Sequence, residues 1–234
     1  MEPFNTLLAA STLLYTSYLD VRTREVDDVV WVVAASLGLV LNAFSVYSGG
    51  LGELLRYGFA VAVSGAVAFA LYFGGLYGGA DAKALLTIAV IQPYVYTWPT
   101  IHGINALTTL TNGMLLSASL PLSFAAYNLF RLIRGEKIFK GFESERKIRK
   151  LAACFIGVRV SKSAGKPFWS PVEKTENGVR KFDFNISIDD IEMVKGNDMW
   201  ITPGIPLLVF FTAGYFINLL AGDLMGWVLF SLTR

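Results

Sequence analysis

Two aspartates, Asp20 and Asp81, are the side chains of this sequence best suited to catalytic chemistry. Each stands at the end of an apolar stretch, where an ionisable group is costly and is usually kept for function. Two carboxylates that share one site cannot both ionise easily, so the pKa of one rises. Such a pair offers one base and one acid near neutral pH. The base can deprotonate water while the acid protonates a carbonyl oxygen, so the pair predicts hydrolysis without a metal, cysteine or serine.

The residues around Asp81 form a short motif, with Gly78, Gly79 and Ala80 before it and Lys83 after it. Glycines let backbone approach closely and adopt positive φ, which would suit an extended substrate beside the acid. An alternative is that Asp81 only caps the next helix, with the glycines as its turn.

A structural alternative also exists for Asp20, which could form an ordinary interfacial ion pair with Arg22 or Arg24. The other candidate groups favour structural roles. Asp27 and Asp28 suit the start of a helix, and the remaining groups are expected at the outer face, in loops or as an inert thiol: Glu53, Asp223, His102, Cys154. With one histidine and one cysteine, the chain has no metal-binding cluster of either type, and we expect no metal and no cofactor.

Composition indicates that membrane helices position these acids. The chain is 54% hydrophobic and 16% charged, whereas average soluble chains carry about 25% charged residues. The charge is concentrated in residues 131–198, and long stretches elsewhere have none. A soluble core would mix the two kinds of residue. The net charge of +2 does not indicate nucleic-acid binding.

The predicted fold is an all-α membrane protein with six transmembrane helices and a small cytoplasmic α/β insert before the last helix. A span needs about 20 mostly apolar residues, and six segments are close enough: 4–19, 28–47, 55–76, 82–98, 106–130 and 203–231. The first is expected to be retained, because Met1-Glu2-Pro3 lacks the positive region of a cleavable signal peptide. The predicted division of the chain is 1–133, with five spans and both acids, then 134–199, the soluble segment, and 200–234, the sixth span.

Basic residues predict the orientation of these spans. Arg22, Arg24, Lys83 and the fifteen basic residues between 131 and 195 fall on one side, which gives eighteen of twenty. The positive-inside rule therefore puts Asp20, Asp81 and residues 134–199 on the cytoplasmic side of the cell membrane, with both termini outside.

Within the soluble segment the patterns predict three kinds of structure. Residues 137–150 look like a basic amphipathic helix on the lipid surface. Residues 161–179, rich in glycine and proline, look like a loop, and the alternation in 182–188 predicts a short strand.

At this point the sequence resembles a known family, the archaeal type IV prepilin and preflagellin (archaellin) signal peptidases, which are membrane aspartyl proteases of the GxGD type. The motif that starts at Asp20 is similar to the family's first catalytic segment, and Trp31 follows it at a fitting distance. Residues 78–81 resemble Gly-x-Gly-Asp, with Ala80 in place of the second glycine. Residues 200–206 resemble the Trp-x-Thr-Pro-x-Ile-Pro that opens the last helix of the preflagellin peptidases.

The resemblance implies that Asp20 and Asp81 are the catalytic pair. It also implies a substrate with a short basic leader followed by a hydrophobic helix, as in archaellins and pilins, cut at the cytoplasmic interface. Acids near the site would suit that leader, and Glu25, Asp27 and Asp28 are the candidates. No segment corresponds to an N-methyltransferase, so cleavage alone is predicted. The oligomeric state is not indicated.

Three other functions are compatible with a helical membrane chain. A presenilin-like protease would place its acids deeper in the bilayer than Arg22, Arg24 and Lys83 indicate. A transporter would carry charges near the midplane and often a repeated half, which the sequence lacks. A scaffold would bind a partner through residues 134–199 and would not need either aspartate.

Overall fold

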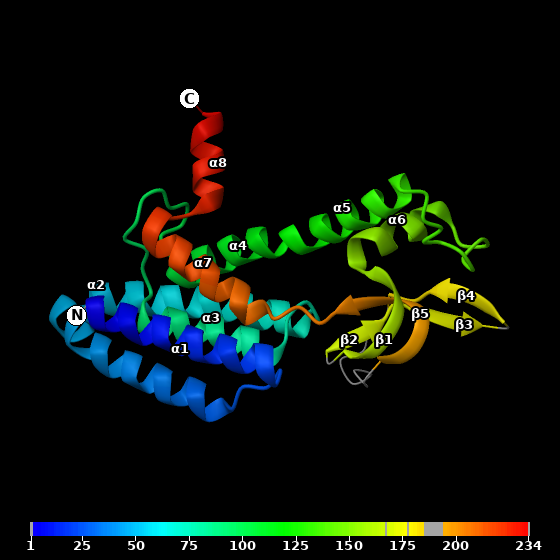
Figure 1. The fold of residues 1–234 in the computed structure, drawn as a ribbon. Helices are drawn as coiled ribbons and strands as arrows, with labels where there is room; N and C mark the ends of the chain where they lie inside the picture. The colour runs from blue at the N-terminus through cyan, green and yellow to red at the C-terminus, as the bar shows by residue number, and fades with distance from the viewer. Residues whose placement is uncertain (1, 167, 177, 185–193, 234) are drawn as a thin grey trace. The chain divides into compact units, whose positions relative to one another are not determined.

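The computed structural model describes residues 2–166, 168–176, 178–184 and 194–233 (Figure 1). The chain divides into two compact units. The first, here called the helical unit, comprises Met1–Ser117 and Pro206–Arg234. The second, here called the mixed unit, comprises Ala118–Ile205. The predicted strand at 182–188 lies largely outside the described residues.

The helical unit contains six of the described helices: α1 Glu2–Arg22, α2 Asp28–Phe73, α3 Gly79–Ile91, α4 Asn105–Ser117, α7 Leu207–Ala221 and α8 Leu224–Leu232. Helix α1 packs against α2, α3 and α7, and α4 packs against α7. These contacts bring helices that are remote in sequence to the two candidate acids.

The second and third predicted spans correspond to the two helical segments of α2, which meet at a kink at Gly50. Its backbone is helical throughout except at Gly50, where φ is 66° and ψ is −157°. Only glycine adopts such a conformation at little cost. The sequence predicted a loop between the two spans, but the chain bends at one residue instead.

The predicted fourth span, 82–98, is helical only as far as Ile91. Proline has no N–H to donate and disfavours helical geometry at the residue before it, so Pro93 ends α3 at this point. Thirteen residues cover about 20 Å, which is less than the roughly 30 Å of a hydrocarbon core.

The last two predicted spans are also divided. Residues 105–133 break at Ala118 between α4 and α5, Ser119–Ile133, because Pro121 cannot donate the helical bond to the carbonyl four residues earlier. Helices α7 and α8 meet at an angle of 52°, and the carboxylate of Asp223 caps α8 by accepting from the amides of Met225 and Gly226.

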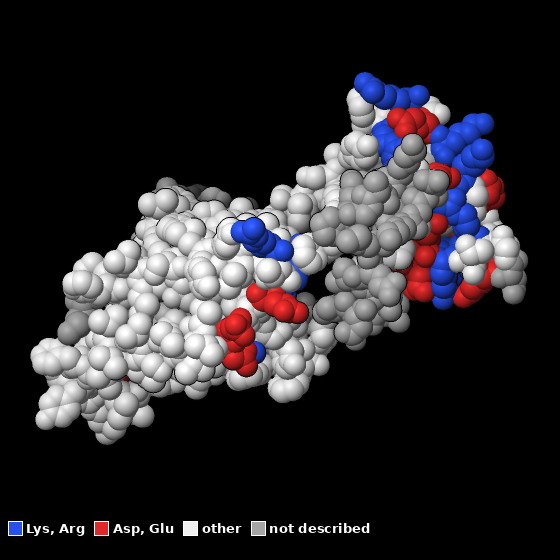
Figure 2. Space-filling view, turned by 60° about the horizontal axis from the view of Figure 1, so that its bottom comes forward, with Lys and Arg blue, Asp and Glu red and all other residues white. Residues whose placement is uncertain are grey.

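Six transmembrane helices are therefore not found as six long helices. By length and composition, two helical segments of the described chain could cross a membrane, Asp28–Phe73 and Asn105–Ile133, and a third if α7 and α8 form one bent span. Figure 2 shows a nearly uncharged face of the helical unit with one small group of acidic and basic side chains.

Close contacts between helices in this unit depend on glycine. A Cβ atom on Gly214 of α7 would lie 2.6 Å from the backbone nitrogen of Gly113 in α4. On Gly38 of α2 it would lie 2.7 Å from the side chain of Ile91 in α3. Small residues allow this approach where no hydrophobic effect drives helices together.

The mixed unit is an α/β structure. It contains α5, α6 Lys147–Ile156 and five strands: β1 Val158–Lys166, β2 Trp169–Pro171, β3 Glu173–Glu176, β4 Val179–Phe182 and β5 Val194–Pro203. Antiparallel strands pair in the order β1-β5-β2, and β3 pairs with β4. The predicted small α/β insert is thus found.

Two local predictions in this segment are wrong. Residues 161–179 contain strands and not a loop, because β1 and β2 find their hydrogen-bonding partner in the distant β5. The predicted helix 137–150 is helical only from Lys147. Before that point the chain forms turns, with Gly141 at a φ of 90°, and these turns place Ile138 and Phe142 in the core.

The core of the mixed unit is aromatic. Trp200 is fully buried, stacks on Phe139 at a centroid distance of 5.5 Å and meets Phe182 edge-on at 5.4 Å. Its indole N–H donates to the carbonyl of Ile138 at 3.2 Å. The residue that opens the Trp-x-Thr-Pro motif is therefore a core residue here.

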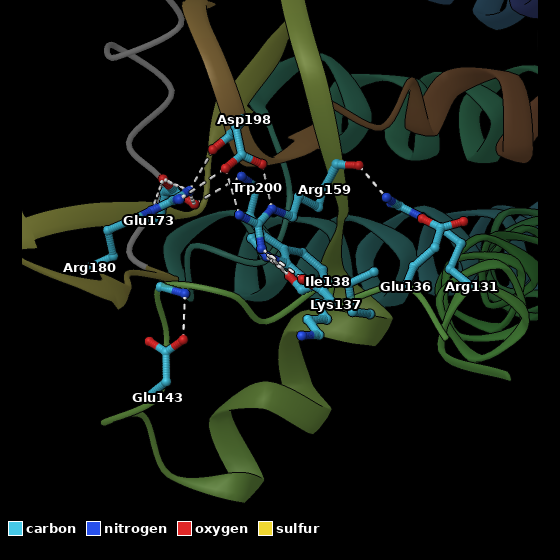
Figure 3. Close-up of polar contacts among 11 residues, drawn as sticks. Arg131, Glu136, Lys137, Ile138, Glu143, Arg159, Glu173, Arg180, Asp198 and Trp200 are labelled. Carbon is cyan, nitrogen blue, oxygen red and sulfur yellow. Dashed lines mark hydrogen bonds and ion pairs between the residues drawn. The ribbon is translucent and has the colours of Figure 1, made fainter. Parts of the chain in front are cut away.

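Ion pairs surround this core (Figure 3). The buried guanidinium of Arg159 donates to both oxygens of Asp198 at 2.6 Å, and Arg180 donates to both oxygens of Glu173. The hydrogen bonds from Arg159 hold the pKa of Asp198 below its ordinary value.

Candidate active site

The structure brings Asp20 and Asp81 together in the helical unit. Asp20 lies in the last turn of α1 and Asp81 in the first turn of α3, and these two helices pack against each other. The carboxyl groups are close enough to interact electrostatically, and both also interact with the charge of Arg24. The expected convergence of two acids remote in sequence is present in this unit.

Asp81 is the more enclosed of the two acids, with 8% of the residue exposed. One of its carboxylate oxygens accepts a hydrogen bond from the amide of Gly78 at 3.1 Å. Asp81 therefore does cap α3, as the structural alternative predicted. Capping leaves the carboxyl group available for catalysis, because its second oxygen takes no part in this hydrogen bond.

The motif residues need no unusual backbone. Gly78 precedes the helix in an extended conformation with φ of −74°, so the expected positive φ is wrong there. Gly79 and Ala80 are the first two residues of α3. A helical position accepts alanine readily, which explains why Ala80 can replace the motif glycine. A side chain at Gly78, in contrast, would lie 3.3 Å from the Asp81 carboxylate.

Asp20 forms an ion pair with Arg24, one of the two partners that its structural alternative named. Its carboxylate lies 3.7 Å from the guanidinium of Arg24, and 15% of the side chain is exposed. It also forms a hydrogen bond with the backbone of Leu208 at the start of α7. Arg22 instead lies over the ring of Tyr18. Arg24 therefore belongs to the site, a role that its charge alone did not indicate.

Hydrogen bonds of two hydroxyl groups, that of Ser17 one turn before Asp20 and that of Thr212 in α7, attach α1 to α7. The hydroxyl of Ser17 donates to the carbonyl of Leu208 at 2.9 Å and shares a hydrogen bond of 2.6 Å with the hydroxyl of Thr212. Thr212 in turn donates to the carbonyl of Leu13 at 3.1 Å. These buried bonds fix the rotation of α1 and with it the direction of Asp20. Sequence reasoning missed them, because isolated Ser and Thr residues carry no pattern.

Tyr77 is a second neighbour that the sequence did not single out. It precedes the glycines, interacts electrostatically with Asp81, and its ring meets Phe211 of α7 edge-on at 5.7 Å. Tyr77 therefore places a phenol near Asp81 from the loop before α3.

Lys83 lies outside the immediate site. Its ammonium group pairs with Asp28 at 2.5 Å and so links the N-terminal part of α3 to the start of α2. Asp28 is thus already engaged. Glu25, Asp27 and Asp28 all line a cavity of about 750 Å³ between the ends of α1 and α2.

The remaining candidates take part in other local structures. Glu53 accepts a hydrogen bond from the phenol of Tyr94 at 3.0 Å, and Asp223 caps α8. His102 lies in the irregular segment between α3 and α4, and Cys154 is a buried thiol in α6.

Comparison with known proteins extends these observations. The sequence model of the type IV leader peptidase family matches residues 7–125, and that of the archaeal peptidase A24 C-terminus, type II, matches residues 149–224. A preflagellin peptidase of Methanococcus maripaludis is 25% identical over 93% of this chain and 94% of its own. Those of Methanococcus voltae and Methanocaldococcus jannaschii are 23% and 24% identical over at least 90% of both chains.

A chain of apolar helices with these relatives is a membrane peptidase. It belongs to the type IV leader peptidase family, because the family model matches just over half of its length, including both aspartates.

Proposed function

We propose that this protein removes the leader peptide from preflagellin or a related prepilin-like precursor, with Asp20 and Asp81 as the catalytic pair. The observation that carries the proposal is the electrostatic interaction of these two carboxyl groups, which come from different helices. The family match and the names of the relatives support the reaction and its substrate class.

The two environments support different roles for the acids. Burial favours a neutral carboxyl group and a nearby cation favours a carboxylate. Asp81 is the more buried and Asp20 pairs with Arg24, so we assign the shared proton to Asp81.

Hydrolysis then proceeds by general acid–base catalysis. Asp20 takes a proton from water as the water oxygen bonds to the scissile carbonyl carbon, and Asp81 gives its proton to the carbonyl oxygen. The tetrahedral intermediate collapses when the C–N bond breaks. The leaving nitrogen takes the proton from Asp20, and a hydroxyl of the intermediate returns a proton to Asp81.

We further propose that the chain crosses the cytoplasmic membrane six times, with the pair and residues 134–199 in the cytoplasm and both termini outside. The bend at Gly50 would then separate two crossings within α2. The fourth crossing would combine α3 with residues 92–98. Irregular backbone is tolerated at membrane depth where protein covers it, and Ile91, Gln92 and Tyr94 are buried.

Single cysteines test this orientation in a chain that carries Cys154→Ser. On intact cells a membrane-impermeant maleimide should label Ser48→Cys, which follows the second predicted span. It should not label Ser144→Cys until the membrane is opened. The reverse pattern would refute the topology but would leave the catalytic pair untouched.

Cleavage of a precursor in isolated membranes tests the catalytic assignment. Asp20→Asn and Asp81→Asn should each abolish leader removal while the protein still inserts. Glu53→Gln, an acid of the same unit that bonds Tyr94, is the matched control and should cleave normally. Full activity of either Asp variant would end the assignment. Chelators and serine- or cysteine-directed reagents should have little effect, and strong inhibition by a chelator would reveal a metal site.

A further inference from the structure

The cavity at the ends of α1 and α2 continues as an apolar groove between the same two helices. The cavity, about 750 Å³, is lined by Tyr15, Leu19 and the acids of residues 25–28. The groove adds about 350 Å³ and shares Tyr15, Val29 and Val30 with the cavity. The two hollows therefore form one continuous surface, acidic at one end and apolar along the rest.

The apolar part has the form of a seat for a helix. Its walls are the exposed side chains of Val33 and Leu37 from α2 and the partly buried side chain of Leu8 from α1. Its floor includes the buried residues Thr12 and Ala34. The hydroxyl of Thr12 donates to a carbonyl of its own helix at 2.8 Å. It therefore needs no hydrogen-bond acceptor from a bound segment. Small floor residues allow a helix to approach closely.

One of the three acids at the acidic end is already paired with a cation. Asp28 pairs with Lys83, but in the part of the chain that the structure describes Glu25 and Asp27 form no ion pair. Both are exposed. An occupant with positive charge at this end would find two carboxylates available to it.

The acidic end of the groove lies near the level of Asp20 along α1. Leu19, the residue before Asp20, lines the acidic cavity, whereas Leu8 lines the apolar part. The eleven residue steps from Leu8 to Leu19 rise about 17 Å along α1. A segment seated here would therefore pass from apolar to basic close to the level of Asp20.

We infer that this groove between α1 and α2 is the docking site of the precursor, with its hydrophobic segment against Val33 and Leu37 and its basic leader over Glu25 and Asp27. This inference rests on the proposed function, because it takes the precursor to be the substrate. The charge and the apolar length of the groove both match that one chain. A lipid acyl chain matches only the apolar part.

Cross-linking in membranes tests the seat directly. The enzyme carries Cys154→Ser and Asp20→Asn, so that the precursor stays whole, and a single cysteine is placed in the hydrophobic segment of the precursor. Val33→Cys and Leu37→Cys should form disulfides with it. Val32→Cys and Leu39→Cys, equally exposed positions of α2 outside the groove, should give several-fold less. Equal yields at all four positions, or higher yields at the controls, would overturn the inference.

Kinetics of the active enzyme provide an independent readout. Val33→Trp should fill the groove and raise KM for the precursor with little change in kcat, whereas Val32→Trp should leave both unchanged. An unaltered KM in Val33→Trp would show that the precursor docks elsewhere and that lipid occupies the groove.

The acidic end is tested by a charge exchange. The double variant Glu25→Gln, Asp27→Asn should raise KM about two- to fivefold for a precursor with a basic leader, and should not affect one whose leader lysines are glutamine. Equal effects on both precursors would refute the leader contact. If the unaltered enzyme cleaves no precursor, the proposed function fails. If it cleaves and these variants behave as their controls, only the docking site fails.

Discussion

The helical unit and the mixed unit stabilise buried polar groups in different ways. In the helical unit neutral amides form the interior bonds: Asn218 donates to the side chain of Asn105 at 2.7 Å, and Asn112 donates to the carbonyl of Gly222 at 3.0 Å. In the mixed unit a buried amide, Asn128, also donates to the carbonyls of Cys154 and Gly157. There, however, arginine and carboxylate pairs surround the core, as at Arg159 and Asp198.

The difference follows from the surroundings of each unit. A charge in an apolar medium costs far more than a hydrogen-bonded amide, so apolar helices use amides where a bond is needed. Against that background two interacting carboxyl groups, Asp20 and Asp81, are an expensive feature for structure alone. The contrast is therefore an argument that they are retained for chemistry.

Packing differs in the same manner. Helices α4 and α7 meet backbone to backbone at Gly113 and Gly214, whereas the mixed unit is filled by large rings such as Trp200 and Phe182. Burial from water rewards large apolar side chains, but close helix contact in lipid rewards small ones. Substitutions in the two units should therefore have opposite size dependence.

The largest effect is expected from truncation in the mixed unit. Trp200→Ala removes a fully buried ring and should lower the free energy of unfolding of this unit by about 3–5 kcal/mol. Amide hydrogen exchange of β1 and β5 in the full-length protein in micelles would measure it. Val179→Ala, at an exposed strand position, is the control. Equal protection in both variants would show that Trp200 is not a core residue.

Enlargement in the helical unit should come next. Gly214→Ala puts a Cβ atom 2.6 Å from the Gly113 backbone, so α4 and α7 must separate, at about 1–3 kcal/mol. Thermal unfolding in micelles would record the loss. Gly58→Ala is a matched control, since a Cβ atom there meets nothing within 4 Å, and it should be neutral or stabilising. If both variants melted alike, the backbone contact would be refuted.

A smaller effect is expected when the Arg159 pair loses its charge. Asp198 has a φ of 57°, which asparagine also tolerates, so Asp198→Asn changes the charge and keeps the backbone. The side chain of Asp198 is 56% exposed, so the loss should be at most about 1 kcal/mol after screening by solvent.

The same pair predicts a pH dependence of stability. Because the folded pKa of Asp198 is held below 3.8 by Arg159, its contribution is complete above that value and is lost as the pH falls through the folded pKa. As the pH falls, the stability of β5 measured by hydrogen exchange should therefore decrease less steeply in Asp198→Asn than in the parent protein. Parallel curves would contradict the assignment.

The smallest effect is expected at the exposed ion pairs of the mixed unit. Glu176 pairs with both Lys174 and Lys181 at 3.0 Å, but such surface pairs contribute little. Glu176→Gln should leave thermal unfolding unchanged within error at neutral pH. A loss comparable to that of Asp198→Asn would remove the distinction between a pair with one buried partner and a pair with both partners exposed.

The sequence predicted the pair of acids and their meeting, because each acid interrupts the apolar pattern at a helix end. It could not predict which neighbours complete the site. Arg24, four residues beyond Asp20, was read only as a topology charge or a competing ion pair, and the Leu208 contact crosses nearly the whole chain. Lys83, assigned to the motif, pairs with Asp28 instead.

Sequence alone determined that this is an apolar helical chain with one charged insert and two well-placed carboxylates, since hydropathy and charge are local properties. Tertiary structure decided where the helices stop and bend, which strands replace an apparent loop, and what surrounds each acid. Those outcomes depend on partners far away in the chain. Strand β5 pairs with β1 across about 30 to 40 residues, and α7, near the end of the chain, packs against α1 at its start. Local sequence patterns do not indicate such partners, because the free energy of these contacts is gained only when the segments meet.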